Sequence, residues 1–131
     1  MTLGDPFVAC LAYVALTHYW ADFTMQTNWM ATNKSKSVKA LSAHVGVYTG
    51  MMAIFAMSLA LSGYFSLPGM FGFVLLNGAL HFCVDFCTSK ITSRYWSQNK
   101  MHEFFAVVGF DQLLHFNCLL ITLVYFWEAH P

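Results

Sequence analysis

Four long runs of apolar residues dominate the chain, and short polar segments separate them. The runs lie at about 7–25, 38–62, 70–87 and 104–127. Each is close to the roughly 20 residues that an α-helix needs to cross a lipid bilayer. We therefore predict an all-α fold, a bundle of four transmembrane helices within a single integral-membrane domain, residues 1–131. The expected helices are at about 7–26, 38–62, 70–91 and 103–128.

Every lysine and arginine of the chain lies between two apolar runs or at the edge of one, and these positions predict the orientation of the helices. Three lie around the junction of the first and second runs, with Lys39 at the very start of the second, and three lie between the third and fourth: Lys34, Lys36, Lys39, Lys90, Arg94 and Lys100. The positive-inside rule places both segments in the cytoplasm. Both termini are then outside the cytoplasm, and the phospholipid bilayer surrounds a multi-pass protein.

The composition agrees with a membrane protein and excludes other classes. Hydrophobic residues make up 58% of the chain and charged residues 9%, whereas an ordinary soluble domain has about 25% charged residues. So few charges cannot cover a surface that faces water. The formal net charge is zero, so we expect no nucleic-acid partner. The sequence leaves the oligomeric state open.

Histidine and aspartate recur at a helical spacing inside the apolar runs. The first and third runs contain His-x3-Asp, the fourth contains Asp-x3-His, and the second contains one histidine. Residues i and i+4 share one face of a helix. Because the fourth run crosses the membrane in the opposite direction, its reversed motif places the carboxylate at a matching depth. We predict that these side chains converge in the cytoplasmic half of the bundle: His18, Asp22, His44, His81, Asp85, Asp111 and His115.

Three aspartates inside apolar helices need a compensating cation. A carboxylate at mid-helix is unfavourable by about 2.5–3.5 kcal/mol on insertion scales, and no lysine or arginine lies inside a run except Lys39, at the very start of the second. The cation must then be a protonated histidine, a proton on the carboxylate or a bound metal. Imidazole with carboxylate suits first-row divalent ions, so we predict zinc, with manganese or iron as alternatives. Seven ligands suit two ions better than one.

Two other interpretations concern the same helices. A single intramembrane histidine or aspartate often serves as an interhelical hydrogen-bonding group without any metal. Cys83 and Cys87 also recur at i+4, but each lies two residues after a motif residue, about 200° around the helix. They should therefore face away from the site and pack as small apolar side chains.

The residues between the motifs extend them into a longer pattern. It reads His18-x3-Asp22-Phe23-x2-Gln26-x2-Trp29-Met30-x3-Lys34, then His44, then His81-x3-Asp85, then Gly109-Phe110-Asp111-Gln112-x2-His115. This pattern spans nearly the whole chain, and through it the sequence resembles a family of small multi-pass membrane proteins of bacteria and phages. That family is similar to predicted membrane-bound metal-dependent hydrolases, which share His-x3-Asp/Glu pairs with zinc phospholipase C and single-strand nucleases. The resemblance implies phosphoester hydrolysis and, with the positive-inside rule, a bacterial inner membrane.

The function that we expect is metal-dependent hydrolysis of a phosphoester. Asp22, Asp85 and Asp111 would be the catalytic carboxylates that bridge or terminate the ions, and a site near headgroup level suits a lipid-linked substrate. A metal carrier also fits a His/Asp-lined path, although the ligands cluster in one half of the membrane. A third hypothesis is a haem or di-iron centre, although the paired aspartates argue against haem. A phage or bacterial membrane factor with a structural metal is the fourth.

Overall fold

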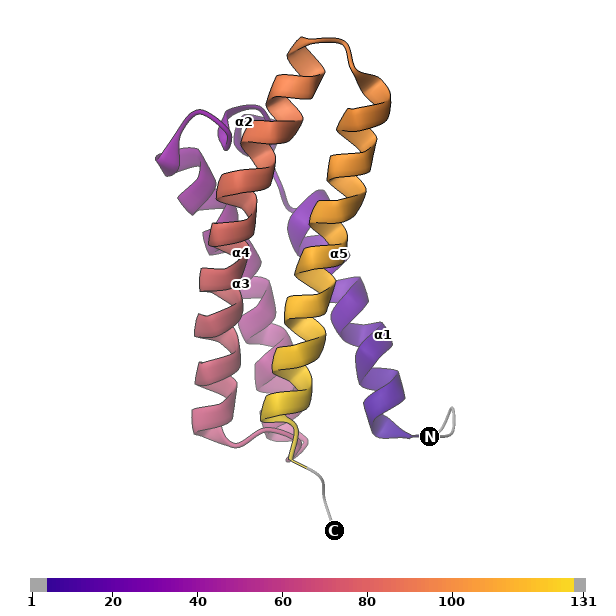
Figure 1. Cartoon of the computed structure of the whole chain (residues 1–131). Helices are drawn as coiled ribbons and strands as arrows, with labels where there is room; N and C mark the ends of the chain where they lie inside the picture. Colours follow the sequence, from indigo (N-terminus) through magenta and orange to yellow (C-terminus); the bar gives the residue numbers. More distant parts are fainter. Residues whose placement is uncertain (1–4, 129–131) are drawn as a thin grey trace.

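The fold was obtained as a computed structural model that describes residues 5–128, and all regular structure within these residues is helical. This confirms the all-α prediction. The elements in chain order are α1 Pro6–Tyr19, the π-helix η1 Trp20–Thr24, α2 Asn28–Asn33, α3 Val38–Leu61, α4 Leu67–Ser97 and α5 Met101–Phe126 (Figure 1).

The long helices run roughly along one axis and pack as a bundle (Figure 1). α4 packs against both α3 and α5, and α1 contacts α3 and α5. The start of α1, the α3–α4 turn and the end of α5 meet at one end. There the Trp127 ring lies 5.1 Å from the Phe7 ring and 4.6 Å from the Tyr64 ring. α2 and the α4–α5 turn form the opposite end.

Polar caps explain where two of the helices begin. Ser37 accepts a hydrogen bond from the Ala40 amide at the start of α3, and Ser66 accepts one from Gly69 at the start of α4. A serine N-cap satisfies an otherwise unpaired amide of the first turn, and proline is tolerated there. α4 therefore begins at Leu67, three residues earlier than expected, because Pro68 belongs to the first turn of the helix.

The other ends also differ from the predicted boundaries. α4 was expected to end near 91 but continues to Ser97, and α5 was expected at 103–128 but spans Met101–Phe126. Asn99, with a φ of 59°, forms the tight turn between them. The extension of α4 beyond residue 91 is a polar segment that water can solvate. A hydropathy pattern alone does not identify such a segment as helical.

The first apolar run is not the uniform α-helix that was expected at 7–26. α1 ends at Tyr19 and is followed directly by η1, in which the Met25 amide bonds the Trp20 carbonyl at 2.8 Å, an i to i+5 bond. Such π-turns are rare and frequently accompany functional sites. The wider turn carries Asp22. A further short helix, α2, was not predicted; Thr27 caps it by accepting from the Met30 amide.

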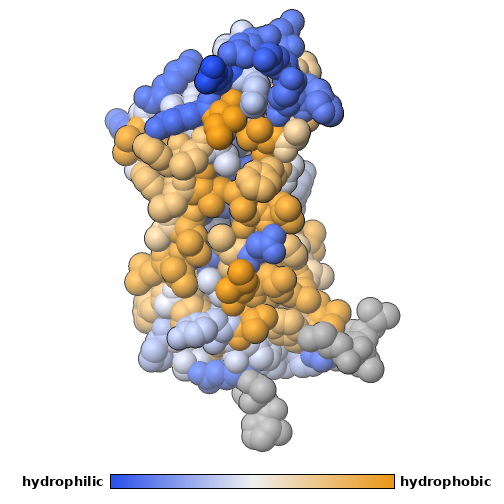
Figure 2. Space-filling model, in the orientation of Figure 1, coloured by the Kyte–Doolittle hydropathy of each residue, from blue (hydrophilic) through white to orange (hydrophobic). Residues whose placement is uncertain are grey.

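The surface has the polarity of a membrane protein. Three helices, α3, α4 and α5, are long and apolar enough to span a membrane. Large apolar side chains such as Ile54, Leu75 and Ile121 point outward and are more than 60% exposed. Figure 2 shows the resulting hydrophobic belt, with a hydrophilic cap over the end formed by α2 and the α4–α5 turn. Apolar atoms face outward because lipid, unlike water, solvates them.

The interior is divided between an apolar half and a polar half. The apolar core lies toward the α3–α4 turn and includes Val14, Met52, Phe55, Phe73 and Leu119. Toward α2, the buried residues include the histidines and aspartates of the motifs. Cys83 and Cys87 are exposed on the outer face of α4, so the prediction that they point away from the polar residues is confirmed.

Candidate metal centre

The bundle brings all seven predicted side chains into one buried cluster. α1 and η1 supply His18 and Asp22, α3 supplies His44, and α4 and α5 supply two residues each. All are at most 9% exposed: His18, Asp22, His44, His81, Asp85, Asp111 and His115. The matched depth of the three motifs, including the reversed one, is therefore present in the folded chain.

Four of these residues direct one atom each toward a common point. His44 Nε2 lies 3.0 Å from Asp22 Oδ1, 3.1 Å from Asp85 Oδ2 and 3.1 Å from His81 Nε2. His81 Nε2 lies 3.5 Å from Asp22 Oδ1 and 3.7 Å from Asp85 Oδ2. Three segments of the chain that are far apart in sequence thus meet at this point.

The donor set and its spacing fit a divalent ion. Zinc binds imidazole nitrogen and carboxylate oxygen at about 2.0–2.2 Å, so ligands of a tetrahedral ion lie roughly 3.3–3.6 Å from one another. The observed separations of 3.0–3.7 Å bracket that value. Two imidazoles and two carboxylates are also a set that zinc, manganese and iron accept. The group Asp22, His44, His81 and Asp85 could therefore hold a metal ion.

A second group shares one residue with the first. One atom each from Asp22, Asp111 and His115 lie within 4.8 Å of one another, and all three residues are buried. His115 Nε2 is 3.4 Å from Asp111 Oδ1 and also 3.2 Å from Asp85 Oδ1. Asp22 therefore belongs to both groups, and Asp85 of the first group contacts His115 of the second.

His18 lies beside these groups but belongs to neither of them. Its Nε2 is 4.0 Å from Asp22 Oδ2 and 3.1 Å from Gln112 Oε1. Because the Gln112 amide nitrogen donates to carboxylates, its Oε1 must accept, so His18 Nε2 carries a proton and donates to it. A protonated nitrogen cannot ligate a metal. In this arrangement His18 orients Gln112 through Nε2, while its buried Nδ1 has no hydrogen-bond partner in the described part of the chain; its ligand role stays a prediction.

Two neutral side chains orient the carboxylates. Gln112 Nε2 donates to Asp22 Oδ2 at 2.7 Å and to Asp111 Oδ2 at 3.1 Å. The Thr88 hydroxyl donates to Asp111 Oδ1. In the sequence, Gln112 stood out only as part of the longer pattern around Asp111, and Thr88 was not identified. Partners of this kind fix the direction of metal-binding carboxylates and tune the metal.

Lys34 corrects the expectation that no basic side chain reaches the aspartates. It caps the C-terminus of α2 and extends into the cluster, where Nζ lies 2.9 Å from Asp85 Oδ2 and 3.5 Å from His44 Nε2. The sequence places Lys34 in a loop, and only the folded chain turns that loop back over the bundle. In the sequence, only the uncompensated negative charge of the three aspartates indicated that a basic side chain would pair with them.

With Lys34 included, the formal charges favour one resident ion. Three carboxylates contribute three negative charges, and the Lys34 ammonium neutralises one of them. With neutral imidazoles the remainder is two negative charges, which one divalent ion balances. A second ion would leave two positive charges, and these would need an anion.

Aromatic rings close the cluster on the side of the apolar core. The Tyr48 ring stacks on the His81 ring at 3.8 Å, and the His81 ring stacks on the His115 ring at 4.1 Å. On the opposite side a cavity of about 220 Å³ opens toward α2. It is lined by Asp22, Asp85 and Asp111 and also by Lys34 and Gln112. This cavity makes the carboxylates reachable from the hydrophilic end.

The chain matches, over residues 10–130, the family described as "Protein of unknown function (DUF3307)". No curated protein and no solved structure matches the chain.

Proposed function

The chain belongs to the DUF3307 family of proteins of unknown function, and we propose that it is a membrane-embedded hydrolase of phosphoesters, most of all lipid-linked ones, that uses a divalent metal ion. The observation that carries this proposal is the convergence of Asp22 Oδ1, His44 Nε2, His81 Nε2 and Asp85 Oδ2 at ligand spacing. Zinc is the ion that the donor set suits best, with manganese or iron as alternatives.

The two groups would hold the metal in a fixed order. Asp22, His44, His81 and Asp85 would hold the first ion, which would neutralise the remaining charge. A second ion at Asp22, Asp111 and His115 is favoured once an anionic substrate supplies negative charge. A divalent ion in such a site lowers the pKa of water and polarises a phosphoryl oxygen.

The protein's own groups would position water and move its proton. While only the first ion is bound, His115 Nε2, which lies 3.2 Å from Asp85 Oδ1 and 3.4 Å from Asp111 Oδ1, could take a proton and be stabilised by both carboxylates. Thr88 and Gln112 hold Asp111 in place. The Lys34 ammonium, at the mouth of the cluster, can stabilise negative charge on the phosphoryl oxygens.

The position of the cavity supports a substrate at headgroup level. The cavity opens at the end that holds every lysine and arginine, and we propose that this end faces the cytoplasm of a bacterial inner membrane. In this arrangement α1 with η1 is the fourth crossing, and both termini are outside the cytoplasm. The apolar half of the bundle blocks a polar route to the other face, which disfavours metal transport.

The test is turnover and metal content of the purified chain in maltoside detergent. We expect bound zinc or manganese and release of phosphate or alcohol from a panel of lipid and soluble phosphoesters. Asp85→Asn and His81→Ala should abolish turnover and reduce bound metal. Matched controls are Glu103→Gln and His102→Ala, which alter exposed residues at the start of α5; both should leave turnover unchanged. A metal-loaded chain that hydrolyses no member of the panel contradicts the proposal.

One observation favours a second candidate. Because Lys34 already pairs with Asp85, the cluster could be a purely structural network in a membrane factor that binds a partner. That candidate predicts a chain without metal above background after preparation without chelator, and unchanged thermal stability on addition of zinc or manganese.

A further inference from the structure

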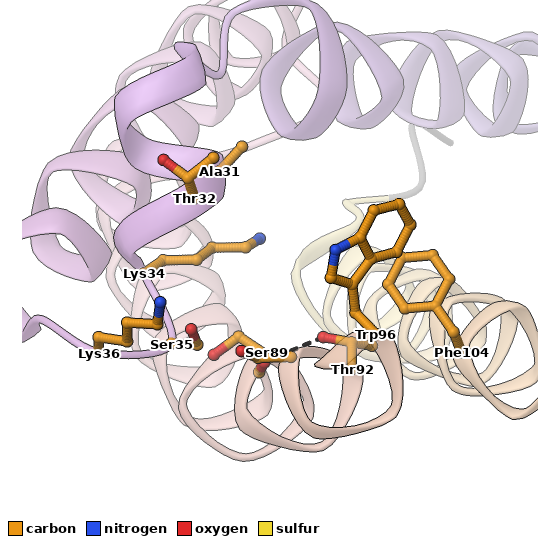
Figure 3. Close-up of a pocket in the computed structure, with 10 residues that line it drawn as sticks. Ala31, Thr32, Lys34, Ser35, Lys36, Ser89, Thr92, Trp96 and Phe104 are labelled. Carbon is orange, nitrogen blue, oxygen red and sulfur yellow. Dashed lines mark hydrogen bonds between the residues drawn. The ribbon is translucent and has the colours of Figure 1, made fainter. Parts of the chain in front are cut away.

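A second, larger cavity adjoins the metal centre at the hydrophilic end of the bundle. Its volume is about 550 Å³, and it lies between the α2 segment, the end of α4 and the start of α5 (Figure 3). Five residues line both cavities: Ala31, Lys34, Ser89, Thr92 and Phe104. A molecule in the outer cavity can therefore reach the inner one past Lys34 and Ser89.

The lining of the outer cavity is cationic and rich in donors. Lys34 and Lys36 approach from one side, and the hydroxyl side chains of Ser89 and Thr92 lie on the α4 side (Figure 3). No acidic residue lines the cavity. Two ammonium groups together with hydroxyls match an anion that has several acceptor oxygens. The tilted Trp96 and Phe104 rings, 5.2 Å apart, form an apolar wall opposite.

Ser89 is the side chain that points to a ligand. It is 6% exposed, and its Oγ is buried without a hydrogen-bond partner in the described part of the chain. Its neighbours on α4 have partners: the Thr88 hydroxyl donates to Asp111, and the Thr92 hydroxyl donates to a carbonyl of its own helix. A buried hydroxyl without a partner is unfavourable, so Ser89 has a donor available at the junction of the two cavities.

We propose that the outer cavity is a binding subsite for the phosphoryl group of a phosphate ester, held by Lys34 and Ser89 at the junction and by Lys36 from the outside. This inference rests on the proposed function, because it names the substrate class of the same site. Trp96 and Phe104 would contact the apolar or glycerol part of the molecule. A lipid headgroup and a soluble phosphate ester present the same chemistry.

The experiment measures binding, not turnover, with the full chain in maltoside detergent by isothermal titration calorimetry. The probes are phosphatidic acid, diacylglycerol, glycerol 3-phosphate and inorganic phosphate. We expect a phosphate-bearing probe to bind and diacylglycerol to bind at least about tenfold more weakly. Ser89→Ala and Lys36→Met should each weaken binding about tenfold, because each removes a donor to an anionic oxygen. Lys36→Arg should retain it.

Matched controls come from the same end of the molecule. Ser97→Ala and Lys39→Met change a serine and a lysine that line neither cavity, and both should bind within about twofold of the unmodified chain. Circular dichroism melts of every variant exclude loss of folding as the cause.

The outcomes separate the subsite from the hydrolase. Binding of phosphatidic acid supports a lipid source, and variant-sensitive binding of glycerol 3-phosphate alone supports a soluble one. A phosphate probe that binds equally to Ser89→Ala, Lys36→Met and the unmodified chain overturns the subsite, even where turnover is found. The chain could also carry no metal and hydrolyse no substrate, yet bind phosphate in a way that Ser89→Ala and Lys36→Met weaken. That result would support the subsite and contradict the hydrolase proposal.

Discussion

At the scale of single residues, the Lys34 ammonium and a bound metal ion would compete for the negative charge of the Asp85 carboxylate. Asp85 Oδ2 lies 2.9 Å from the Lys34 ammonium and 3.1 Å from His44 Nε2, and it belongs to the four-residue group that could hold a metal. An ammonium and a divalent ion repel each other at this range. Lys34 therefore stabilises the metal-free protein and opposes metal binding unless an anion lies between them.

Lys34→Met should make the protein depend on metal. Removal of one partner of a buried ion pair costs about 3–5 kcal/mol, because the other charge stays buried and unpaired. We expect a lower melting temperature without metal, and a larger stabilisation by added zinc than in the unmodified chain. Thermal melts with and without zinc measure both effects. Lys39→Met is the control, and an equal response of the two variants would show that Lys34 does not neutralise Asp85.

Gln112→Ala should weaken the metal site without removal of a ligand. The substitution deprives Asp22 and Asp111 of an amide donor and leaves the His18 Nε2 proton without its acceptor. Loss of such an orienting partner lowers metal affinity by about 10–100-fold. Competition with a chromogenic chelator measures the affinity. Gln98→Ala, in the exposed α4–α5 turn, should bind metal as the unmodified chain does; a Gln112 variant of undiminished affinity would contradict the orienting role.

At the scale of elements, two local irregularities position the site. In η1 the bond from the Met25 amide to the Trp20 carbonyl widens the turn that carries Asp22, and Asp22 reaches His44 on α3. One turn before His81, α3 and α4 approach closely at Gly78. A Cβ added at Gly78 would lie 2.8 Å from Thr49 Oγ1. The absence of a side chain there allows His44 and His81 to meet.

Gly78→Ala should push α4 away from α3 and disturb the four-residue group. Thr49 is β-branched and stiff on a helix, so it cannot easily move aside. Overpacking of this kind costs typically about 1–3 kcal/mol, and the separation of His44 from His81 should lower metal affinity. Gly50→Ala is the control, because no atom lies within 4 Å of a Cβ there. Equal melting temperatures and equal metal affinities for the two variants would refute this account.

At the scale of the whole molecule, polarity is arranged along the bundle axis. A hydrophilic cap covers α2 and the α4–α5 turn (Figure 2), and the buried polar cluster and then the apolar core follow it inside the bundle. Such an arrangement is asymmetric across a bilayer, so substrate and metal would enter from one side only. The direction of that asymmetry in the cell depends on the six basic residues at the hydrophilic end.

Labelling of single introduced cysteines tests the direction. Ser62→Cys lies in the exposed α3–α4 turn and Gln98→Cys in the exposed α4–α5 turn. We expect a membrane-impermeant maleimide to label Ser62→Cys in intact spheroplasts and Gln98→Cys only after permeabilisation. The unmodified chain measures background from the four native cysteines. Labelling of Gln98→Cys in intact spheroplasts would reverse the orientation and place the cavity outside the cytoplasm.

The sequence by itself determined the features that depend on local spacing. Helical runs follow from apolar length, and the shared face of His81 and Asp85 follows from an i to i+4 repeat, so the all-α fold and the pairs within each helix could be predicted. The burial of Asp111 and His115 beside them also follows, because a reversed motif in a reversed helix restores the same depth.

Only the tertiary structure decided which side chains complete the cluster. Lys34 reaches Asp85 across 51 positions and Gln112 reaches Asp22 across 90, and no local pattern encodes a contact between segments so far apart. The same holds for His18, whose partner is an amide on α5 and not a metal ligand group. The π-turn at Asp22 and the unpaired hydroxyl of Ser89 likewise arise from packing. Periodicity is a property of one helix, whereas hydrogen bonds and charge pairs between helices exist only once the chain is folded.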